Sequence, residues 1–365
     1  MRTHQKKYMQ LAIVGIRGLP NTYGGFETLA ENLVHHLSKD LDITVYCSSK
    51  DMESRMDTFD GARLKYIPVT SHGAFGIIYD SIALVRAVLK NDKVLFLGFG
   101  GGFVVPFLWR YKSKLILNIG GLDWQRSKWS GFAQKIIRKA EALLMKNCGT
   151  LISDNVGIQQ YIQQQYGRSS TLIAYGGDQA VPQEILPEHL TIYPFLSSPY
   201  AFAVCRIQHD NNINMILDAF VENPVIPLVL VGNWADSEYG IKTKSDYSAE
   251  QNLILLDAIY DRKLLDVLRS NCTFYIHGHS AGGTNPSLAE AMYLGLPVFA
   301  FASGYNEHTT NHQALYFGNL EELKKLIRAY SSVDLEKMGN SLREIAVKAY
   351  RWSTIADQYK QLILD

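Results

Sequence analysis

Short apolar runs alternate with amphipathic stretches along the first half of the chain. The run LAIVG at 11–15 is apolar throughout and ends in glycine, which is typical of a buried parallel strand. Similar runs recur, separated by stretches in which apolar residues return every three or four positions, as on one face of a helix. The pattern predicts strands at 11–15, 42–47, 93–97, 114–118, 150–153 and 170–174, and helices at 28–37, 81–89 and 129–145.

The same alternation restarts after a loop rich in glycine, proline and polar residues at about 176–198. It predicts strands at 200–205, 227–231, 253–255, 274–277 and 297–300, and helices at 215–220, 261–269, 287–293 and 320–329. Two such runs indicate an α/β protein with two Rossmann-like, doubly wound parallel sheets facing a central cleft. We expect an N-terminal domain at 1–178 and a C-terminal domain at 179–344. A last helix, at about 345–365, is expected to pack back on the first domain.

A glycine-rich segment follows the first predicted strand and precedes a helix. It runs GIRGLPNTYGGFE from Gly15 to Glu27, with Gly24 and Gly25 directly before the helix. Glycines let a backbone approach a ligand closely, and a helix N-terminus offers N–H groups to an anion, so this segment is a candidate phosphate site. Its glycines do not have the spacing of the G-x-G-x-x-G dinucleotide fingerprint. The alternative is a plain strand-to-helix turn.

A second glycine loop, GHSAGGTNPS, begins at Gly278 between a predicted strand and a predicted helix. Its backbone N–H groups form a second candidate anion site, at Gly282, Gly283, Thr284 and Asn285. Glu290 lies on the first turns of the helix, where a carboxylate can reach ribose hydroxyls. The alternative for Glu290 is a solvated helix face.

Arg206 follows the first strand of the second half, in the segment VCRIQHDNN. Because ligands of doubly wound sheets bind at the carboxyl ends of the strands, an arginine there is placed to pair with a phosphate. The alternative is an ordinary surface arginine.

At these residues the chain resembles glycosyltransferase family 4, retaining enzymes with the two-sheet GT-B fold. The resemblance covers nearly the whole chain. It rests on P-x-x-x-G-G-x-E ending at Glu27, on the strand ending in Arg206, and on NPSLAEAMYLGLPV at 285–298. It implies an enzyme that takes a sugar from a nucleotide-sugar donor, bound by the C-terminal domain, to an acceptor bound by the N-terminal domain.

The resemblance also implies roles for single residues. In the family, the second of two glutamates eight residues apart holds the nucleotide ribose, and here that residue is Glu290. The first contacts the transferred sugar, and here that position is Gly282. An arginine and a lysine five residues later clamp the pyrophosphate, and here these are Arg206 and Asn211. The chain therefore lacks one carboxylate and one cation of the family's site.

Other groups are expected to compensate for the two losses. Loop amides at 283–284 and at Gly24 and Gly25 would bind more of the pyrophosphate charge, and His279 or the loop amides would hold the sugar. Neither an Asp-x-Asp at a strand end nor a His/Cys cluster is present, so we expect metal-independent chemistry and no cofactor beside the donor. The predicted donor site is Gly24, Gly25, Arg206, Asn211, Gly282, Gly283, Thr284, Asn285 and Glu290.

The acceptor side has its own candidates in GGLDWQRSKW, which follows a predicted strand. Asp123 is the candidate carboxylate near the acceptor and, with Arg206, the second candidate catalytic residue. Trp124 is expected to stack on an acceptor sugar and Arg126 to bind the acceptor. The alternatives are a helix-capping role for Asp123 and core packing for Trp124.

Three segments, IRGLPNTYGGFET, GGLDWQRSKW and GHSAGGTNPSL, resemble a narrower group. These are bacterial β-1,4-rhamnosyltransferases of capsule and polysaccharide assembly that use dTDP-L-rhamnose. The likeness implies transfer of L-rhamnose to a lipid-linked saccharide. The alternatives are a glycosyltransferase using a UDP- or GDP-sugar, a GT-B epimerase, and a non-catalytic sugar-nucleotide binding protein.

The charge is distributed unevenly, although the net charge is only +1. Residues 1–178 carry 22 Lys+Arg and 14 Asp+Glu, whereas the remainder carries 14 and 21. Nine of the basic residues lie at 104–146, interleaved with Trp109, Trp124 and Trp129. A basic and aromatic surface suits an anionic membrane, and no nucleic-acid-reading motif is present.

We therefore expect a cytoplasmic protein, peripheral at the inner face of the cell membrane. The four cysteines are far apart and read as reduced core residues rather than a metal site or a disulfide framework. The basic N-terminus has no signal-peptide core, and no apolar run reaches the 18 residues of a membrane helix.

Overall fold

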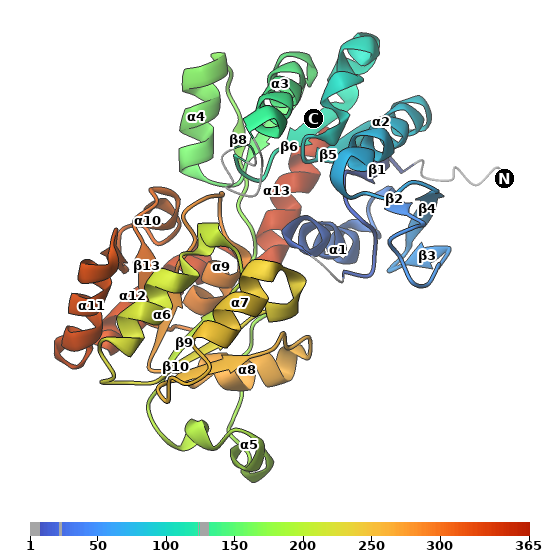
Figure 1. Cartoon of the computed structure of the whole chain (residues 1–365). Helices are drawn as coiled ribbons and strands as arrows, with labels where there is room; N and C mark the ends of the chain where they lie inside the picture. The colour runs from blue at the N-terminus through green and yellow to red at the C-terminus, as the bar shows by residue number, and fades with distance from the viewer. Residues whose placement is uncertain (1–7, 22–23, 123, 125–130) are drawn as a thin grey trace. The chain divides into compact units, whose positions relative to one another are not determined.

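The computed structural model describes residues 8–21, 24–122, 124 and 131–365 (Figure 1). The chain forms two compact units. The first takes the described residues before 175 together with Trp352–Asp365, and the second takes Tyr175–Arg351. Within the described residues the chain thus passes between the units at 174–175 and again at 351–352.

The first unit contains a sheet with eight described strands in the order β3-β4-β2-β1-β5-β6-β7-β8. Neighbouring strands are parallel, apart from the antiparallel pair of β3 and β4. The central strands are apolar runs, and Leu11, Val45 and Leu95 are fully buried. The strands are β1 (Gln10–Val14), β2 (Asp42–Ser48), β3 (Thr58–Phe59), β4 (Ala62–Ile67), β5 (Lys93–Leu97), β6 (Leu115–Asn118), β7 (Thr150–Ser153) and β8 (Thr171–Leu172).

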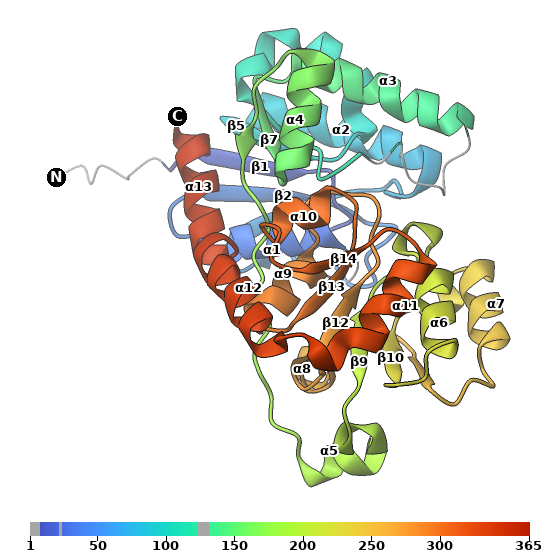
Figure 2. The same cartoon turned by 90° about the vertical axis from the view of Figure 1, so that its left-hand side faces the viewer.

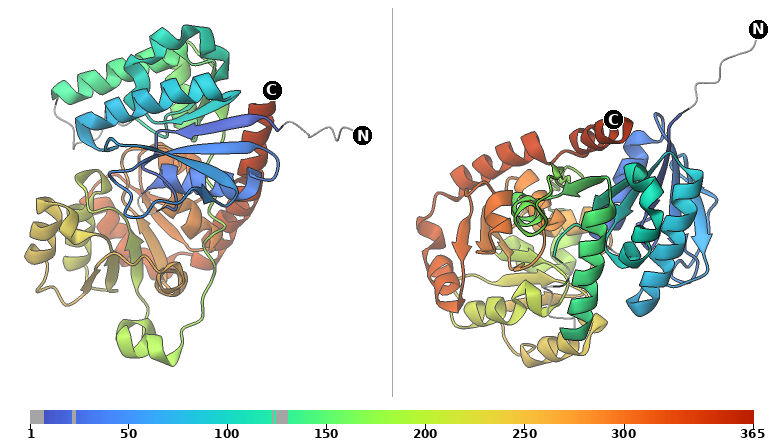
Figure 3. Two further views of the ribbon diagram at one scale, coloured as in Figure 1. Left: turned by 90° about the vertical axis from the view of Figure 1, so that its right-hand side faces the viewer. Right: turned by 90° about the horizontal axis from the view of Figure 1, so that it is seen from above.

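Helices cover both faces of this sheet, with α2 and α3 on one face and α1 on the other (Figure 2). The last helix, α13, lies beside α1 (Figure 3). Tyr359 on α13 accepts a hydrogen bond from the buried Asn118 at the end of β6, at 2.7 Å. The helices are α1 (Gly25–Leu37), α2 (Gly73–Lys90), α3 (Gly131–Asn147), α4 (Val156–Tyr166) and α13 (Trp352–Leu364), with 3-10 helices η1 (Gly100–Phe103) and η2 (Val105–Lys114).

The second unit contains a parallel sheet in the order β11-β10-β9-β12-β13-β14. Its apolar strands meet the helices in one core, in which the rings of Phe274 and Phe299 stack at 4.4 Å. The strands are β9 (Ala201–Val204), β10 (Leu228–Val231), β11 (Leu253–Leu256), β12 (Phe274–His277), β13 (Val298–Phe301) and β14 (Leu315–Phe317). The helices are α5 (Pro187–Ile192), α6 (Ile213–Val221), α7 (Glu238–Asp246), α8 (Arg262–Ser270), α9 (Pro286–Tyr293), α10 (Tyr305–Thr309), α11 (Leu320–Ala329) and α12 (Leu335–Ala349).

The strand order reverses once in each sheet, beside β1 and β5 in the first unit and beside β9 and β12 in the second. Connections leave in opposite directions at such a switch point, so a crevice opens outside the carboxyl ends of the strands. The first glycine segment follows β1, and Arg206 and the second glycine loop follow β9 and β12. The predicted α/β class, with two mostly parallel doubly wound sheets, is confirmed.

Two local predictions were wrong. The amphipathic helix predicted at 129–145 is α3, which begins at Gly131, and its apolar Phe132 is 75% exposed instead of packing in the core. The reason is that α3 packs through its later turns, where Ala140 lies against Gly102 of η1. The loop expected at 176–198 contains the short helix α5.

Candidate active site

Arg206 is exposed at the carboxyl end of β9, and its backbone is held by a buried neighbour. The side-chain amide of Asn211 donates to the Arg206 carbonyl oxygen at 2.5 Å. Asn211 is only 3% exposed. At the position where the family has its second cation, this chain therefore has a buried asparagine that binds the backbone of Arg206. Direct contact of Asn211 with the donor stays a prediction.

The glycine loop after β12 is joined to the loop after β9. Ser280 donates from its backbone N–H and from its hydroxyl to the Asp210 carbonyl oxygen, both at 2.9 Å. Asn212 donates to the Gly278 carbonyl oxygen at 2.8 Å. A Cβ at Gly278 would lie 2.2 Å from the Asn211 carbonyl oxygen, so only glycine permits this approach. The structure therefore brings Arg206 and the second glycine loop together at the carboxyl ends of two adjacent central strands, β9 and β12.

The last residue of the glycine loop caps the N-terminus of α9. Asn285 caps this helix, because its Oδ1 accepts from the Ser287 N–H at 3.1 Å. Thr284 is buried beside it. Gly282 has φ of +124°, and a Cβ there would meet no atom within 4 Å. The position that carries a glutamate in the family is thus open space next to a helix N-terminus, which favours anions.

Glu290, one turn into α9, is bound by two side chains that the sequence did not reveal. Its Oε1 accepts from Gln179 Nε2 at 2.5 Å, and its Oε2 pairs with Arg269 Nη1. Arg269 is 3% exposed and also pairs with Asp266 at 2.6 Å. Burial lowers the pKa of Arg269 while Glu290 and Asp266 raise it, and the net direction is upward. The carboxylate predicted to hold ribose therefore has a fixed position.

The sequence pointed to His279 but not to His277, which stacks on it at the end of β12. His277 is 1% exposed and lies parallel to His279, with ring centroids 4.4 Å apart. Neither ring nitrogen of His277 has a hydrogen-bond partner among the described residues. Burial lowers its pKa to about 3, so the ring is neutral. The period-two spacing of Tyr275, His277 and His279 was the available signal for a common strand face.

In the first unit, the glycine segment after β1 adopts a conformation that requires glycine. Gly15 has φ of +94°, and a Cβ there would lie 2.0 Å from the Leu97 carbonyl oxygen of β5. Glu27, 7% exposed on α1, accepts from the Arg17 N–H at 2.9 Å and so fixes the segment. Gly24 and Gly25 begin α1, where the glycine cap contributes no side-chain bond.

The start of the predicted acceptor segment, which follows β6, packs against this glycine segment. A Cβ at Gly120 would be 2.5 Å from the ring of Phe26, so the chain after β6 touches the residue next to Gly25. Trp124 is half-buried, with the Arg138 guanidinium 5.1 Å from its ring. Asp123 and Arg126 lie outside the described residues, and their roles stay predictions.

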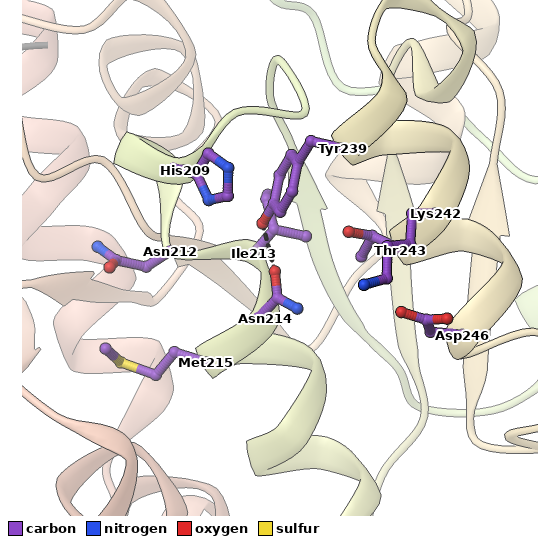
Figure 4. Close-up of a pocket in the computed structure, with 9 residues that line it drawn as sticks. All are labelled: His209, Asn212, Ile213, Asn214, Met215, Tyr239, Lys242, Thr243 and Asp246. Carbon is purple, nitrogen blue, oxygen red and sulfur yellow. Dashed lines mark hydrogen bonds between the residues drawn. The ribbon is translucent and has the colours of Figure 1, made fainter. Parts of the chain in front are cut away.

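A hollow of about 420 Å³ borders the loop after β9 (Figure 4). The His209 and Tyr239 rings lie 3.8 Å apart there, and Tyr239 donates to Asn214. The hollow contains none of the predicted donor residues. It is lined by His209, Asn212, Ile213, Asn214, Met215, Tyr239, Lys242, Thr243 and Asp246.

The part of the chain that the structure describes offers neither a metal site nor a membrane-spanning helix. Within 8–21, 24–122, 124 and 131–365, no three His, Cys, Asp or Glu side chains are grouped to hold a metal ion. In the same part of the chain, every helix is too short or too polar to cross a membrane.

Several solved structures have a similar fold. Sucrose-phosphate synthase from Thermosynechococcus elongatus is 17% identical, with a TM-score of 0.82 over 97% of this chain and 98% of that one. HepE from Anabaena in complex with UDP is 13% identical, with a TM-score of 0.73 over 97% and 99%. An E. coli trehalose-6-phosphate structure bound with UDP-2-fluoro glucose is 9% identical, with a TM-score of 0.71 over 97% and 98%.

Sequence comparison divides the chain as the strand pattern does. Residues 8–178 match a family described as Domain of unknown function (DUF1972), and residues 194–348 match Glycosyl transferases group 1. No curated protein sequence matches the chain. The second unit is therefore a glycosyl transferases group 1 domain, and the chain is a glycosyltransferase with the GT-B fold.

Proposed function

We propose that this enzyme is a retaining, metal-independent transferase that moves L-rhamnose from dTDP-L-rhamnose to a lipid-linked saccharide in bacterial polysaccharide assembly. The observation that carries the proposal is that the loop of Arg206 binds the 278–285 loop, which leads into the helix of Glu290, in the glycosyltransferase unit. The choice of donor is supported by the likeness of three segments to rhamnosyltransferases that use dTDP-rhamnose.

In this proposal the protein stabilises the leaving group. Arg206 pairs with the pyrophosphate, and amides at 283–284 and the N-terminus of α9 bind its remaining charge. The bond from the anomeric carbon to the phosphate oxygen breaks while a bond to the acceptor oxygen forms on the same face. The acceptor's proton passes to the departing phosphate, so the step needs no separate protein base. Asp123, Trp124 and Arg126 position the acceptor.

The lipid-linked acceptor is supported by the surface of η2 and α3 in the first unit. Phe107, Trp109 and Phe132 are 82%, 66% and 75% exposed there. Arg110, Lys112, Lys135, Arg138, Lys139 and Lys146 are exposed on the same two elements. Glu141, the acid on α3, is fully buried and accepts from Tyr161 and Tyr166. We call these nine exposed residues the aromatic–basic surface, and we propose that it meets an anionic membrane.

A donor screen tests the proposal. Purified protein is incubated with dTDP-rhamnose, UDP-hexoses and GDP-mannose, and nucleotide release and thermal shift are recorded. We expect stabilisation and turnover with dTDP-rhamnose. The Arg206→Ala and Glu290→Ala variants should lower kcat/KM by about ten- to a hundredfold, the range for losing a hydrogen bond to a charged group. Arg328→Ala, at an exposed arginine of α11, is the control and should retain activity.

A UDP-sugar donor is the second candidate, because two of the structures with this fold contain UDP or UDP-2-fluoro glucose. Stabilisation by a UDP-sugar and not by dTDP-rhamnose would select it. Full activity of both alanine variants would contradict the assignment of Arg206 and Glu290.

A further inference from the structure

Both oxygens of the Glu290 carboxylate are engaged by side chains of the second unit. Gln179 donates to Oε1 at 2.5 Å, and Arg269 pairs with Oε2. A carboxylate oxygen accepts about two hydrogen bonds. Each oxygen therefore retains a limited capacity for a ligand hydroxyl, and the Glu290 side chain is 19% exposed, so a ligand can reach it.

The Arg269 side of this cluster is part of the protein interior. Arg269 and Asp266 are 3% and 5% exposed and lie 2.6 Å apart. Breaking such a buried pair leaves a charge without compensation, which is strongly unfavourable. Arg269 is thus a fixed partner of Glu290, and a nucleotide does not displace it. Only the bond to Gln179 can be exchanged with a ligand.

Gln179 is held in place from both sides along its own segment. The Gly177 N–H donates to the Tyr350 carbonyl oxygen at 2.7 Å, and the Val181 N–H donates to Asp266 Oδ2 at 3.0 Å. A Cβ at Gly177 would lie 2.5 Å from the Ala289 backbone, so the segment crosses α9 in direct contact. The amide of Gln179 therefore faces Glu290 because its backbone is anchored.

We propose that Gln179 makes this site prefer nucleotides that lack a 2′-hydroxyl. A ribose presents two neighbouring hydroxyls to a carboxylate, whereas a 2′-deoxyribose presents only the 3′-hydroxyl. The Gln179 amide supplies to Glu290 the bond that a 2′-hydroxyl would supply. The 2′-hydroxyl of a ribonucleotide must then share Oε1 with this amide or displace it. In either case the hydroxyl leaves water for less than it would gain at an open carboxylate oxygen. The inference rests on the proposed function, because it requires that a nucleoside diphosphate bind at Glu290.

The test compares dUDP with UDP, two ligands that differ only in the 2′-hydroxyl. Dissociation constants are measured by titration calorimetry on the full chain. For the wild type we expect dUDP to bind about two- to tenfold more tightly than UDP, the range of one net hydrogen bond. Gln179→Ala should bring this ratio to about one or reverse it. Gln183→Ala, on the same segment with its amide bonded to the Val181 carbonyl oxygen, should keep the wild-type ratio.

The ratio separates selectivity from a structural role, because a general disturbance of the site weakens both ligands equally. Gln179→Asn, which shortens the side chain and retains the amide, provides the same comparison if the alanine variant does not fold. Equal affinities in the wild type, or an unchanged ratio in the variants, would overturn the role of Gln179 and leave the proposed function standing. A folded wild type that binds neither nucleotide would overturn both.

Discussion

At the scale of single residues, His277 makes the stability of the second unit depend on pH. Its ring is fully buried beside His279, and burial lowers its pKa to about 3 from an unfolded value of about 6.5. Below pH 6.5 the unfolded chain binds a proton that the folded chain does not. The contribution of the neutral His277 ring to the free energy of unfolding is therefore complete at neutral pH and is lost as the pH falls from 6.5 towards 3.

His277→Phe should remove this dependence and retain the stacking. At pH 5 the histidine costs the folded state about 2 kcal/mol relative to pH 7 and above, from linkage between the two pKa values. Urea unfolding of the wild type and the variant, measured at pH 7 and pH 5, checks the figure. Between pH 7 and pH 5, the free energy of unfolding of the variant should fall by about 2 kcal/mol less than that of the wild type. Equal losses would show that the ring is protonated in the folded protein.

At the scale of elements, the candidate active site of the second unit lies on two loops that are hydrogen-bonded to each other. Ser280 and Asn212 bind across them, and Gly278 lies against the Asn211 carbonyl. The carboxyl ends of β9 and β12 are adjacent in the sheet. The position of Arg206 relative to the glycine loop therefore follows from this junction.

Gly278→Ala should separate the two loops. The added methyl would lie 2.2 Å from the Asn211 carbonyl oxygen, and overpacking of this kind costs about 1–3 kcal/mol. We expect a lower free energy of unfolding and a higher KM for the donor. Gly131→Ala is the matched control, because a Cβ there meets no atom within 4 Å. Unchanged donor KM in Gly278→Ala would contradict the role of the junction.

The sequence predicted most of these elements but few of their long-range contacts. Periodicity located the strands, and the glycine segments marked the loops at both switch points, because these signals are local. The binding of Glu290 by Gln179 joins positions 111 residues apart, and the pair of Arg269 with Glu290 joins two helices. Such pairs leave no local pattern. The exposure of Phe132 likewise depends on which turns of α3 meet η1.

At the scale of the whole molecule, a nearly neutral chain has opposite charge in its two halves. Residues 1–178 hold 22 Lys+Arg and 14 Asp+Glu, and the remainder holds 14 and 21. Because Glu141 is buried, it places no carboxylate among the exposed basic residues of the aromatic–basic surface. An anionic membrane would attract the first half and repel the second, so the distribution of charge favours one orientation on the membrane.

Vesicle flotation tests this orientation with the full chain. The wild type should float with vesicles rich in anionic lipid and stay below with neutral ones, and the bound fraction should fall from 0.1 to about 1 M salt as screening shortens the range of the attraction. Trp109→Ser with Phe132→Ser removes two aromatic anchors and should reduce binding. Ile192→Ser with Val225→Ser, at exposed positions of the second unit, is the matched control. Equal recovery with both vesicle types would exclude the electrostatic attraction. Wild-type flotation of the first double variant would exclude anchoring by Trp109 and Phe132.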